Sequence, residues 1–216
     1  MRPGYLGFVA HEIRNPLSTA LWTAEMLVRM TMADRGGARG EKLSAMCLRS
    51  VSRVRQLVED HLLCERLDTG GLPLCIEAIG ARDAVDAVLE RHPAEIASAH
   101  GDRSVGVEAD RGLLERAIEG LVAVAGAERT PVSVTSHVAD GRVAFLVKGR
   151  TAEEGALSDP VKGTPSDPTG RALSIALARR IAAALGGALV VQGGGWLLTV
   201  PRAQGYTAPP STTAFP

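Results

Sequence analysis

The stretch Phe8-Val-Ala-His-Glu-Ile-Arg-Asn-Pro-Leu17 decides how the first part of the chain folds. Apolar residues recur in it at spacings of three and four, and this pattern continues for several turns, which predicts an amphipathic helix. His11 and Asn15 are four residues apart and therefore share one face of that helix. Pro16 cannot donate a backbone hydrogen bond to Glu12, so we expect a bend just beyond the histidine.

The same stretch contains the residues of a nucleophilic site. A neutral imidazole nitrogen of His11 is a nucleophile near neutral pH and can take up a phosphoryl group. Glu12 can accept a hydrogen bond from the other ring nitrogen or take the proton that the attack releases. Asn15 lies one turn further on, where it can orient a water molecule or an incoming phosphorylated group. We therefore predict that His11, Glu12 and Asn15 are the catalytic residues.

A second helical pattern follows a polar, glycine-rich break at residues 34–40 and extends from Glu41 to Arg66. Two helices joined by a short loop form an antiparallel hairpin, and two helices alone leave apolar surface uncovered. A second copy of the hairpin would cover this surface in a four-helix bundle. We assign residues 1–67 to this domain.

The pattern changes to mixed helices and strands after the hairpin. Leu72–Ile79 alternates as a strand does, and Asp110 can cap a helix that runs to about Ala125. Val132–Val138 and Arg142–Lys148 flank a turn that contains glycine and predict a β-hairpin. The expected fold class is α+β, in which a helical hairpin is followed by an α/β sandwich over residues 72–202.

Composition limits the classes of partner. The 216 residues include 24 basic and 24 acidic side chains, a balance that gives no electrostatic reason to bind nucleic acid. No apolar stretch is long enough to span a membrane, and three cysteines without a paired spacing indicate neither a disulfide framework nor a zinc site. We expect a cytoplasmic protein with a protein partner, and a disordered tail over residues 203–216 because this segment lacks periodicity.

Phe8–Leu17 resembles the phosphoacceptor box of two-component histidine kinases, and the order of elements after the hairpin resembles their ATP-binding domain. This resemblance covers about residues 5–202. It implies that His11 carries phosphate, that the chain forms a homodimer through residues 5–66, and that its partners are response-regulator receiver domains. Only ten residues precede His11, so we expect either a relay component complete in itself or part of a longer kinase.

The nucleotide motifs of that family are not matched. In the family, the helix that begins at Asp110 here carries two asparagines, one of which holds the magnesium bound to ATP. Those positions correspond to Gly120 and Val124, and neither residue offers the oxygen ligand that a hard cation requires.

Two further nucleotide motifs also differ. The aspartate that reads the adenine amino group is missing after the strand that ends near Lys148, and the next acidic residue is Glu153. The glycine-rich turn that would hold phosphates is reduced to Gly170, which is followed by Arg171 and Ala172. We therefore expect no bound cofactor in this chain.

A complete phosphoacceptor box beside incomplete nucleotide motifs favours a histidine phosphotransferase that exchanges phosphate between His11 and receiver aspartates. Magnesium would then be supplied by the acidic pocket of the partner receiver domain. Two other functions remain open: a divergent ATP-dependent sensor histidine kinase core, and a non-catalytic pseudokinase that serves as a scaffold. A phosphatase that acts on a receiver is also compatible with the box, because Asn15 could place a water molecule.

Overall fold

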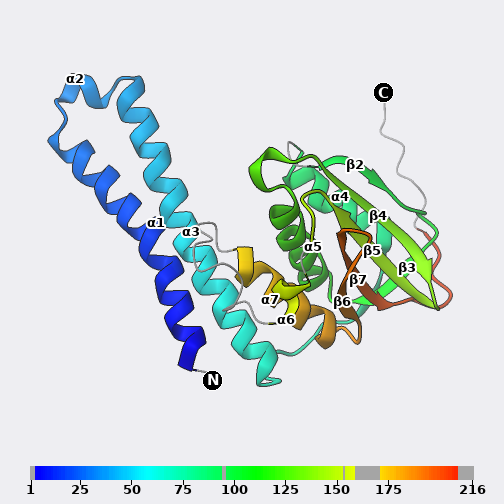
Figure 1. Ribbon diagram of the computed structural model, residues 1–216. Helices are drawn as coiled ribbons and strands as arrows, with labels where there is room; N and C mark the ends of the chain where they lie inside the picture. The colour runs from blue at the N-terminus through cyan, green and yellow to red at the C-terminus, as the bar shows by residue number, and fades with distance from the viewer. Residues whose placement is uncertain (1–2, 94–95, 153, 159–170, 209–216) are drawn as a thin grey trace, which may run out of the picture.

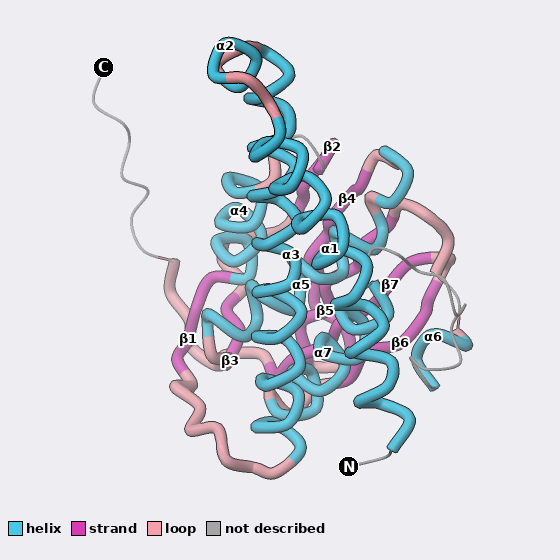
Figure 2. Tube along the Cα trace, turned by 90° about the vertical axis from the view of Figure 1, so that its left-hand side faces the viewer, coloured by secondary structure: helices cyan, strands magenta, loops and turns pink. Residues whose placement is uncertain are grey.

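The computed structural model describes residues 3–93, 96–152, 154–158 and 171–208. A long helical hairpin stands at one side, and an α/β domain packs against it (Figure 1). Seen from the hairpin side, the helices of the second domain lie directly behind the hairpin and its strands lie further back (Figure 2). The molecule is thus built from a hairpin, a layer of helices and a sheet.

The hairpin consists of α1 (Pro3–Arg29) and α3 (Ala38–Asp68). α1 continues through Pro16, and α3 begins before Glu41, where the sequence predicted its start. Both helices are longer than three heptads, and long contact between them lets each bury one apolar face.

The glycine-rich connection between the two helices contains a further short helix, α2 (Met32–Arg35), where the sequence predicted a break. The hydroxyl of Thr31 accepts a hydrogen bond from the backbone N–H of Asp34 at 3.2 Å and donates one to the Asp34 carboxylate at 2.7 Å. This side-chain cap gives a backbone N–H of the first turn a hydrogen-bond acceptor and explains why a helical turn forms in a polar segment.

The inner face of the hairpin is marked by Ala20, Thr23 and Leu43, which are all buried. Because Thr23 is buried, its hydroxyl donates to the backbone carbonyls of Thr19 and Ala20, both at 2.9 Å. Cys47 Sγ lies 3.6 Å from the Ala20 carbonyl oxygen. The first half of α3 therefore lies beside the second half of α1, as an antiparallel hairpin requires.

In its described residues, the second domain contains two sheets and five further helices, one of which is a 3₁₀ helix. Its elements in chain order are β1 (Glu77–Gly80), α4 (Ala81–Arg91), β2 (Ile96–His100), β3 (Gly106–Ala109), α5 (Arg111–Ala125), the 3₁₀ helix η1 (Ala127–Arg129), β4 (Val132–Ala139), β5 (Arg142–Lys148), α6 (Gly155–Ser158), α7 (Arg171–Ala184), β6 (Ala188–Gln192) and β7 (Gly195–Pro201). The predicted cap of α5 is confirmed, because the Asp110 carboxylate accepts the Leu113 N–H at 3.1 Å. The strand predicted over Leu72–Ile79 forms only from Glu77, since the preceding residues connect the hairpin to the second domain.

The larger sheet has the strand order β2-β4-β5-β7-β6, with β2 and β4 parallel and the other pairs antiparallel. Alternate residues of its central strands, such as Val143, Phe145 and Val147, point into a core that α5 and α7 cover. The predicted β4–β5 hairpin is confirmed. Its turn places Asp140 and Gly141 at φ values of 50° and 72°, the left-handed pair that such a turn requires.

The smaller sheet pairs β1 with β3 and places Gly80 opposite Gly106. A Cβ atom at Gly106 would lie 2.2 Å from Cγ of Tyr206, and one at Gly80 would lie 2.8 Å from the Tyr206 hydroxyl. The tyrosine ring therefore lies directly on the backbone of both strands. Ala203, where the sequence predicted the start of a disordered tail, is buried and donates its N–H to the Gly106 carbonyl at 3.0 Å. Residues 209–216 of that predicted tail lie outside the described part of the chain.

Candidate functional site

His11 and Asn15 are both exposed on one face of α1. Glu12, in contrast, is only 4% exposed. It occupies the same side of the helix as Ala20 and Thr23, which faces α3. The structure thus brings His11 and Asn15 together on open surface and places the Glu12 carboxylate in the interior of the hairpin.

A shallow pocket of about 300 Å³ adjoins Asn15 in the groove between the two hairpin helices. Its remaining lining comes from both helices: Pro16, Thr19, Arg49, Ser50 and Arg53. The two guanidinium groups, the Ser50 hydroxyl and the Asn15 amide are donors that suit oxyanions, whereas the Thr19 hydroxyl donates to the Asn15 carbonyl at 3.2 Å. The pocket therefore gives the His11 face an electropositive, hydrogen-bonding border.

The sequence alone did not indicate Arg49 and Arg53 as part of the site. They are four residues apart on α3 and share a face, but a helix of this length carries several such pairs. The register of the hairpin singles them out, because it sets this face beside Asn15. That register was not available from the periodicity of either helix.

Gly120, which stands where the family has an asparagine, lies against α7. A Cβ atom at this position would approach the Cβ of Ser174 to 3.3 Å and its carbonyl oxygen to 3.5 Å. Val124, the other such position, is half-buried and packs against the apolar core. Neither residue offers an oxygen atom from its side chain, and a longer side chain at Gly120 would require α7 to shift.

The chain that leaves β5 is held by backbone hydrogen bonds on two sides. Arg150 N–H donates to the carbonyl of Ala125 at the end of α5, at 2.8 Å, and Ala152 N–H donates to that of Gly194 in the β6–β7 turn, at 3.0 Å. Gly149 approaches α5 so closely that a Cβ atom would lie 2.5 Å from the Ala125 oxygen. The sequence predicted that the aspartate which would read the adenine amino group is missing after this strand. At Gly149 the backbone leaves no room for any side chain.

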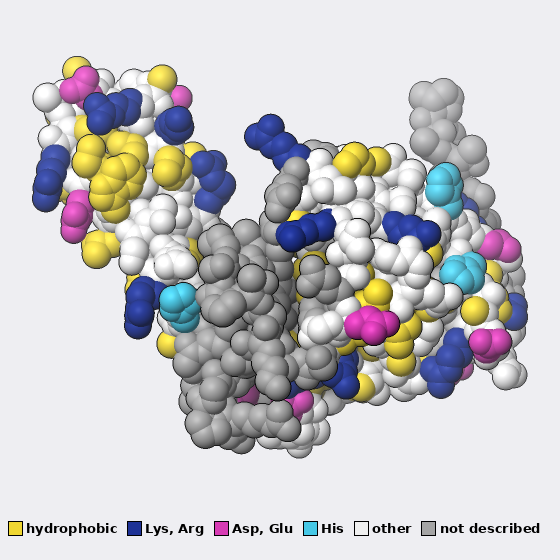
Figure 3. Space-filling model, in the orientation of Figure 1, with side chains coloured by type: hydrophobic (Ala, Val, Ile, Leu, Met, Phe, Trp, Pro, Cys, Tyr) yellow, Lys and Arg dark blue, Asp and Glu magenta, His cyan; other side chains and the backbone are white. Residues whose placement is uncertain are grey.

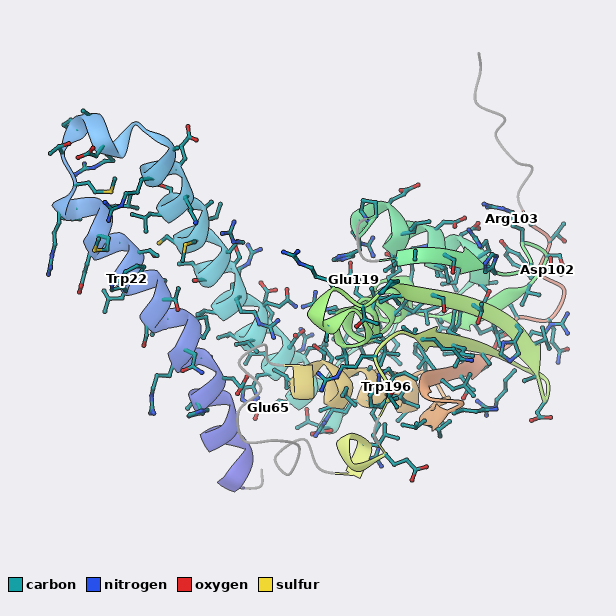
Figure 4. All side chains as sticks on the ribbon, turned by 45° about the horizontal axis from the view of Figure 1, so that its top comes forward. Trp22, Glu65, Asp102, Arg103, Glu119 and Trp196 are labelled. Atoms are coloured by element: carbon teal, nitrogen blue, oxygen red, sulfur yellow. The ribbon has the colours of Figure 1, made fainter. Side chains whose placement is uncertain are left out.

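Trp196 fills the core beside this strand end. It is 2% exposed and pairs in register with Val147 of β5, and Figure 4 shows it between α7 and the strands. Its indole Nε1 has no hydrogen-bond partner among the described residues. A large apolar ring therefore occupies this part of the helix–sheet interface.

Glu153 and Gly170 lie outside the described residues. Arg171 begins α7 and Ala172 follows it, but only their backbone is described.

A buried ion pair joins the hairpin to the second domain. Asp60 Oδ1 accepts hydrogen bonds from Nη2 and Nε of Arg116 at 2.7 and 3.2 Å, and from Nε2 of Gln56 at 3.2 Å. Burial raises the pKa of Asp60 above its ordinary value, while the positive charge of Arg116 and the two hydrogen-bond partners oppose this without cancelling it. The carboxylate is thus well satisfied in geometry but costly to desolvate.

Among the described residues, no helix is both long enough and apolar enough to cross a bilayer.

Comparison with known proteins gives a family match for the hairpin and a likeness in fold for most of the chain. Residues 5–70 match the model of the His Kinase A (phospho-acceptor) domain. None of the curated proteins matches the sequence. The histidine kinase AdeS of Acinetobacter baumannii has a similar structure, with a TM-score of 0.64 and 20% identity over 88% of this chain and 95% of that chain.

Two further solved structures are similar over most of this chain. Full-length ShkA in complex with AMPPNP gives a TM-score of 0.60 and 24% identity, over 96% of this chain and 48% of that one. Histidine kinase ThkA in complex with the response regulator protein TrrA gives a TM-score of 0.63 and 17% identity, over 91% of this chain and 60% of that one. These likenesses confirm the predicted fold of a helical hairpin followed by an α/β domain.

Proposed function

We propose that this chain is a histidine phosphotransferase, because residues 5–70 match the His Kinase A (phospho-acceptor) domain and the chain is similar in fold to histidine kinases. His11 would exchange a phosphoryl group with the aspartates of response-regulator receiver domains, without binding ATP. The observation that carries the proposal is the exposed His11 beside a pocket lined by two arginines, on a core whose Gly120 position is closed by α7.

The transfer step needs only His11 and the receiver. The lone pair of an imidazole nitrogen attacks phosphorus, an N–P bond forms, and the P–O bond to the receiver aspartate breaks. The aspartate leaves as a carboxylate, and the ring becomes a phosphoimidazolium that keeps the proton on its other nitrogen or loses it to a base. The reverse reaction delivers the phosphoryl group to a second receiver, and magnesium stays with the receiver that supplies it.

Asn15 and Glu12 are proposed to orient this reaction from two sides. Asn15 borders the pocket and can hold an oxygen of the phosphoryl group, with Arg49 and Arg53 behind it to balance negative charge. Glu12 is buried in the hairpin, and its proposed part is to take up the proton that the attack releases or to hold the imidazole in one tautomer.

The second domain supports the proposal by what its nucleotide-facing positions contain. No side-chain oxygen is present at Gly120 or Val124, and Gly149 and Trp196 leave backbone and an apolar ring where polar recognition would be needed. Magnesium would find none of the oxygen ligands that a hard cation requires in the side chains at these described positions.

A homodimer is the second part of the proposal. Exposed apolar side chains recur at helical spacing on both hairpin helices and form one stripe, which we call the hairpin stripe: Leu17, Leu21, Val28, Val51, Val58 and Leu62. Hydrophobic side chains gather visibly on the hairpin (Figure 3). Such a surface is unusual on a monomer, and pairing with a second hairpin over residues 5–66 would bury it in a four-helix bundle.

A receiver domain is the proposed partner, since the ThkA structure contains a response regulator. Location in the cytoplasm stays a prediction from the sequence.

The test is to supply the protein with a receiver domain that has been phosphorylated by a small phosphodonor and purified. We expect an acid-labile, base-stable phosphoryl label on the wild-type chain and none on the His11→Ala variant. Radiolabelled ATP with magnesium is the parallel arm. Label on His11 from ATP would show the alternative, an ATP-dependent kinase core, which the fold fits equally well.

Absence of label from both donors would favour the third possibility, a scaffold or a phosphatase. Loss of phosphate from the receiver without label on His11 would identify the phosphatase. In that case the Asn15→Ala variant should lose the activity.

A further inference from the structure

The chain that follows β7 lies against the smaller sheet. Val107 of β3 pairs with Ile79 of β1 on one side and with Arg202 on the other. The Ala203 N–H donates to the Gly106 carbonyl at 3.0 Å. Residues 202 and 203 therefore extend the smaller sheet as a short third strand, and the end of the described chain runs beside β3 (Figure 1).

The ring of Tyr206 lies where two glycines face each other in this sheet. Gly80 and Gly106 are paired across β1 and β3. A Cβ atom at Gly106 would lie 2.2 Å from Cγ of the ring, and one at Gly80 would lie 2.8 Å from its hydroxyl oxygen. The ring thus spans both strands, and it fits because each strand lacks a side chain there. We call the space above Gly80 and Gly106 the glycine slot.

The two ends of the glycine slot differ in polarity. At Gly106 the slot meets the carbon end of the ring. The Cβ position at Gly80 that meets the hydroxyl also lies 2.3 Å from Oδ2 of Asp83, in the first turn of α4. A phenol has a flat apolar body and a polar tip, so it matches both ends. The slot therefore favours tyrosine over an aliphatic side chain.

Two residues of this segment make its side-chain contacts. Ala203 is 4% exposed and Tyr206 is half-buried, whereas the residues at positions 202, 204, 205 and 207 are exposed. Gly205 has a φ of 70°, so the chain can turn there and bring the ring back over the sheet. The docked pattern is thus a small residue that pairs with β3, followed three positions later by an aromatic residue.

Contacts of this kind do not require a covalent link. An extended peptide that adds a strand to a sheet binds through its backbone, and slots for its side chains give specificity. A separate peptide with the same pattern could make the same contacts to β1, β3 and α4. Without any occupant, β3 would present an unpaired edge beside an open slot.

We propose that the smaller sheet is a peptide-binding site, which the chain fills with its own residues 202–206. The ligand class is an extended peptide with a small residue at the position of Ala203 and a tyrosine three positions later. The chain's own segment has a high effective concentration because it is covalently attached, so it occupies the site until a competing peptide displaces it. The inference is independent of the proposed function, since no residue of the hairpin takes part in it.

The test uses the full chain and a fluorescent peptide that copies residues 202–208, Arg-Ala-Gln-Gly-Tyr-Thr-Ala. In the released variant, Ala203→Asp with Tyr206→Ala, a charge at a buried position and loss of the ring should free the segment and leave the site intact. Fluorescence polarisation should show saturable binding to the released variant, and binding to the parent that is weaker by about tenfold or more. A peptide that carries the Tyr206→Ala change should also bind the released variant about tenfold more weakly, or worse.

Two further glycine substitutions in the released variant locate the binding site. Gly106→Ala puts a methyl group into the glycine slot, so the peptide should no longer bind. Gly112→Ala is the matched control, because a Cβ atom there would meet nothing closer than Oδ1 of Asp110 at 3.6 Å. Its replacement should leave peptide binding unchanged.

Absence of binding to a folded released variant would overturn the proposal. Equal binding of the two peptides would do so too, and so would binding that survives Gly106→Ala. If the released variant is unfolded, the peptide should restore its thermal unfolding transition, and failure to restore it would also overturn the proposal. Phosphoryl transfer enters none of these measurements, so its failure would leave the peptide site unaffected.

Discussion

Trp196 of β7 lies directly opposite Val147 of β5, and both side chains are buried on the sheet face that α5 and α7 cover. The pair closes the core one residue before β5 ends at Lys148. An indole in this position contributes much of the apolar area between α7 and the sheet. The Trp196 side chain thus fills this end of the core of the second domain.

Replacement of Trp196 by Ala should destabilise the second domain by about 3–5 kcal/mol, the usual cost of removing a large buried ring. Urea unfolding would measure it. Trp22, the only other tryptophan, is 52% exposed on the outer side of α1 (Figure 4), so Trp22→Ala should cost about 0.5 kcal/mol or less. Equal losses in the two variants would contradict this account of Trp196.

His11→Ala should abolish phosphoryl transfer and leave the unfolding free energy within about 0.5 kcal/mol of the parent, because the imidazole is exposed. The label on the protein and a thermal melt measure the two effects separately. Ser18→Ala, also exposed on α1, is the control and should transfer normally. A large loss of stability in His11→Ala would show a structural role for the ring.

Leu21→Glu should convert the proposed dimer into a monomer, because it puts a charge into the middle of the hairpin stripe. Light scattering coupled to size exclusion measures the mass in solution. Met32→Glu is the matched control, since Met32 is exposed on α2 outside the stripe, and it should stay dimeric. A monomeric parent protein would refute the dimer.

Asp60→Asn should remove the part of the pH dependence of the unfolding free energy that comes from the Asp60 carboxyl group. The pKa of Asp60 is raised in the folded state from its ordinary value of 3.8, so the folded chain holds this proton more tightly than the unfolded chain. The stability that Asp60 contributes is therefore complete below pH 3.8 and declines as the pH rises through the folded pKa.

The measurement is the unfolding free energy of the parent minus that of Asp60→Asn, from acidic to neutral pH. This difference should fall as the pH rises. A difference that increases with pH would mean that attraction to Arg116 outweighs burial.

Gly106→Ala should destabilise the smaller sheet, because the added Cβ would meet the Tyr206 ring at 2.2 Å. Tyr206→Ala alone should also be destabilising, through loss of the ring contact. The double variant should be more stable than the sum of the two single effects, since the clash disappears with the ring. Strict additivity would place the tyrosine elsewhere in solution.

The local parts of this fold could be predicted from the sequence. The cap at Asp110 and the turn at Asp140 and Gly141 are set by residues a few positions apart, and both are confirmed. Helical periodicity likewise predicts α1 and α3. It does not reveal the turn at α2, because four residues are too few to show a periodicity and the turn depends on a side-chain cap at Thr31.

The long-range parts could not be predicted in this way. Asp60 and Arg116 are 56 residues apart, and each looks like one of many charges on an exposed helix face. Tyr206 lies in a segment without periodicity, so nothing in its neighbourhood indicates that two glycines far back in the chain accommodate it. Pocket residues Arg49 and Arg53 depend in the same way on a register between helices.

The position of β7 in the sheet determines the order in which the parts of the chain can fold during synthesis. Among the described strands, β7 is the last to leave the ribosome, yet it lies between β5 and β6. Until it emerges, β5 has an unpaired edge, and the sheet cannot complete its core. The hairpin, synthesised first and stabilised by contacts within 68 residues, can fold and meet another nascent hairpin before then. Assembly between chains would in that way precede completion of the second domain, so partner choice would be settled during translation.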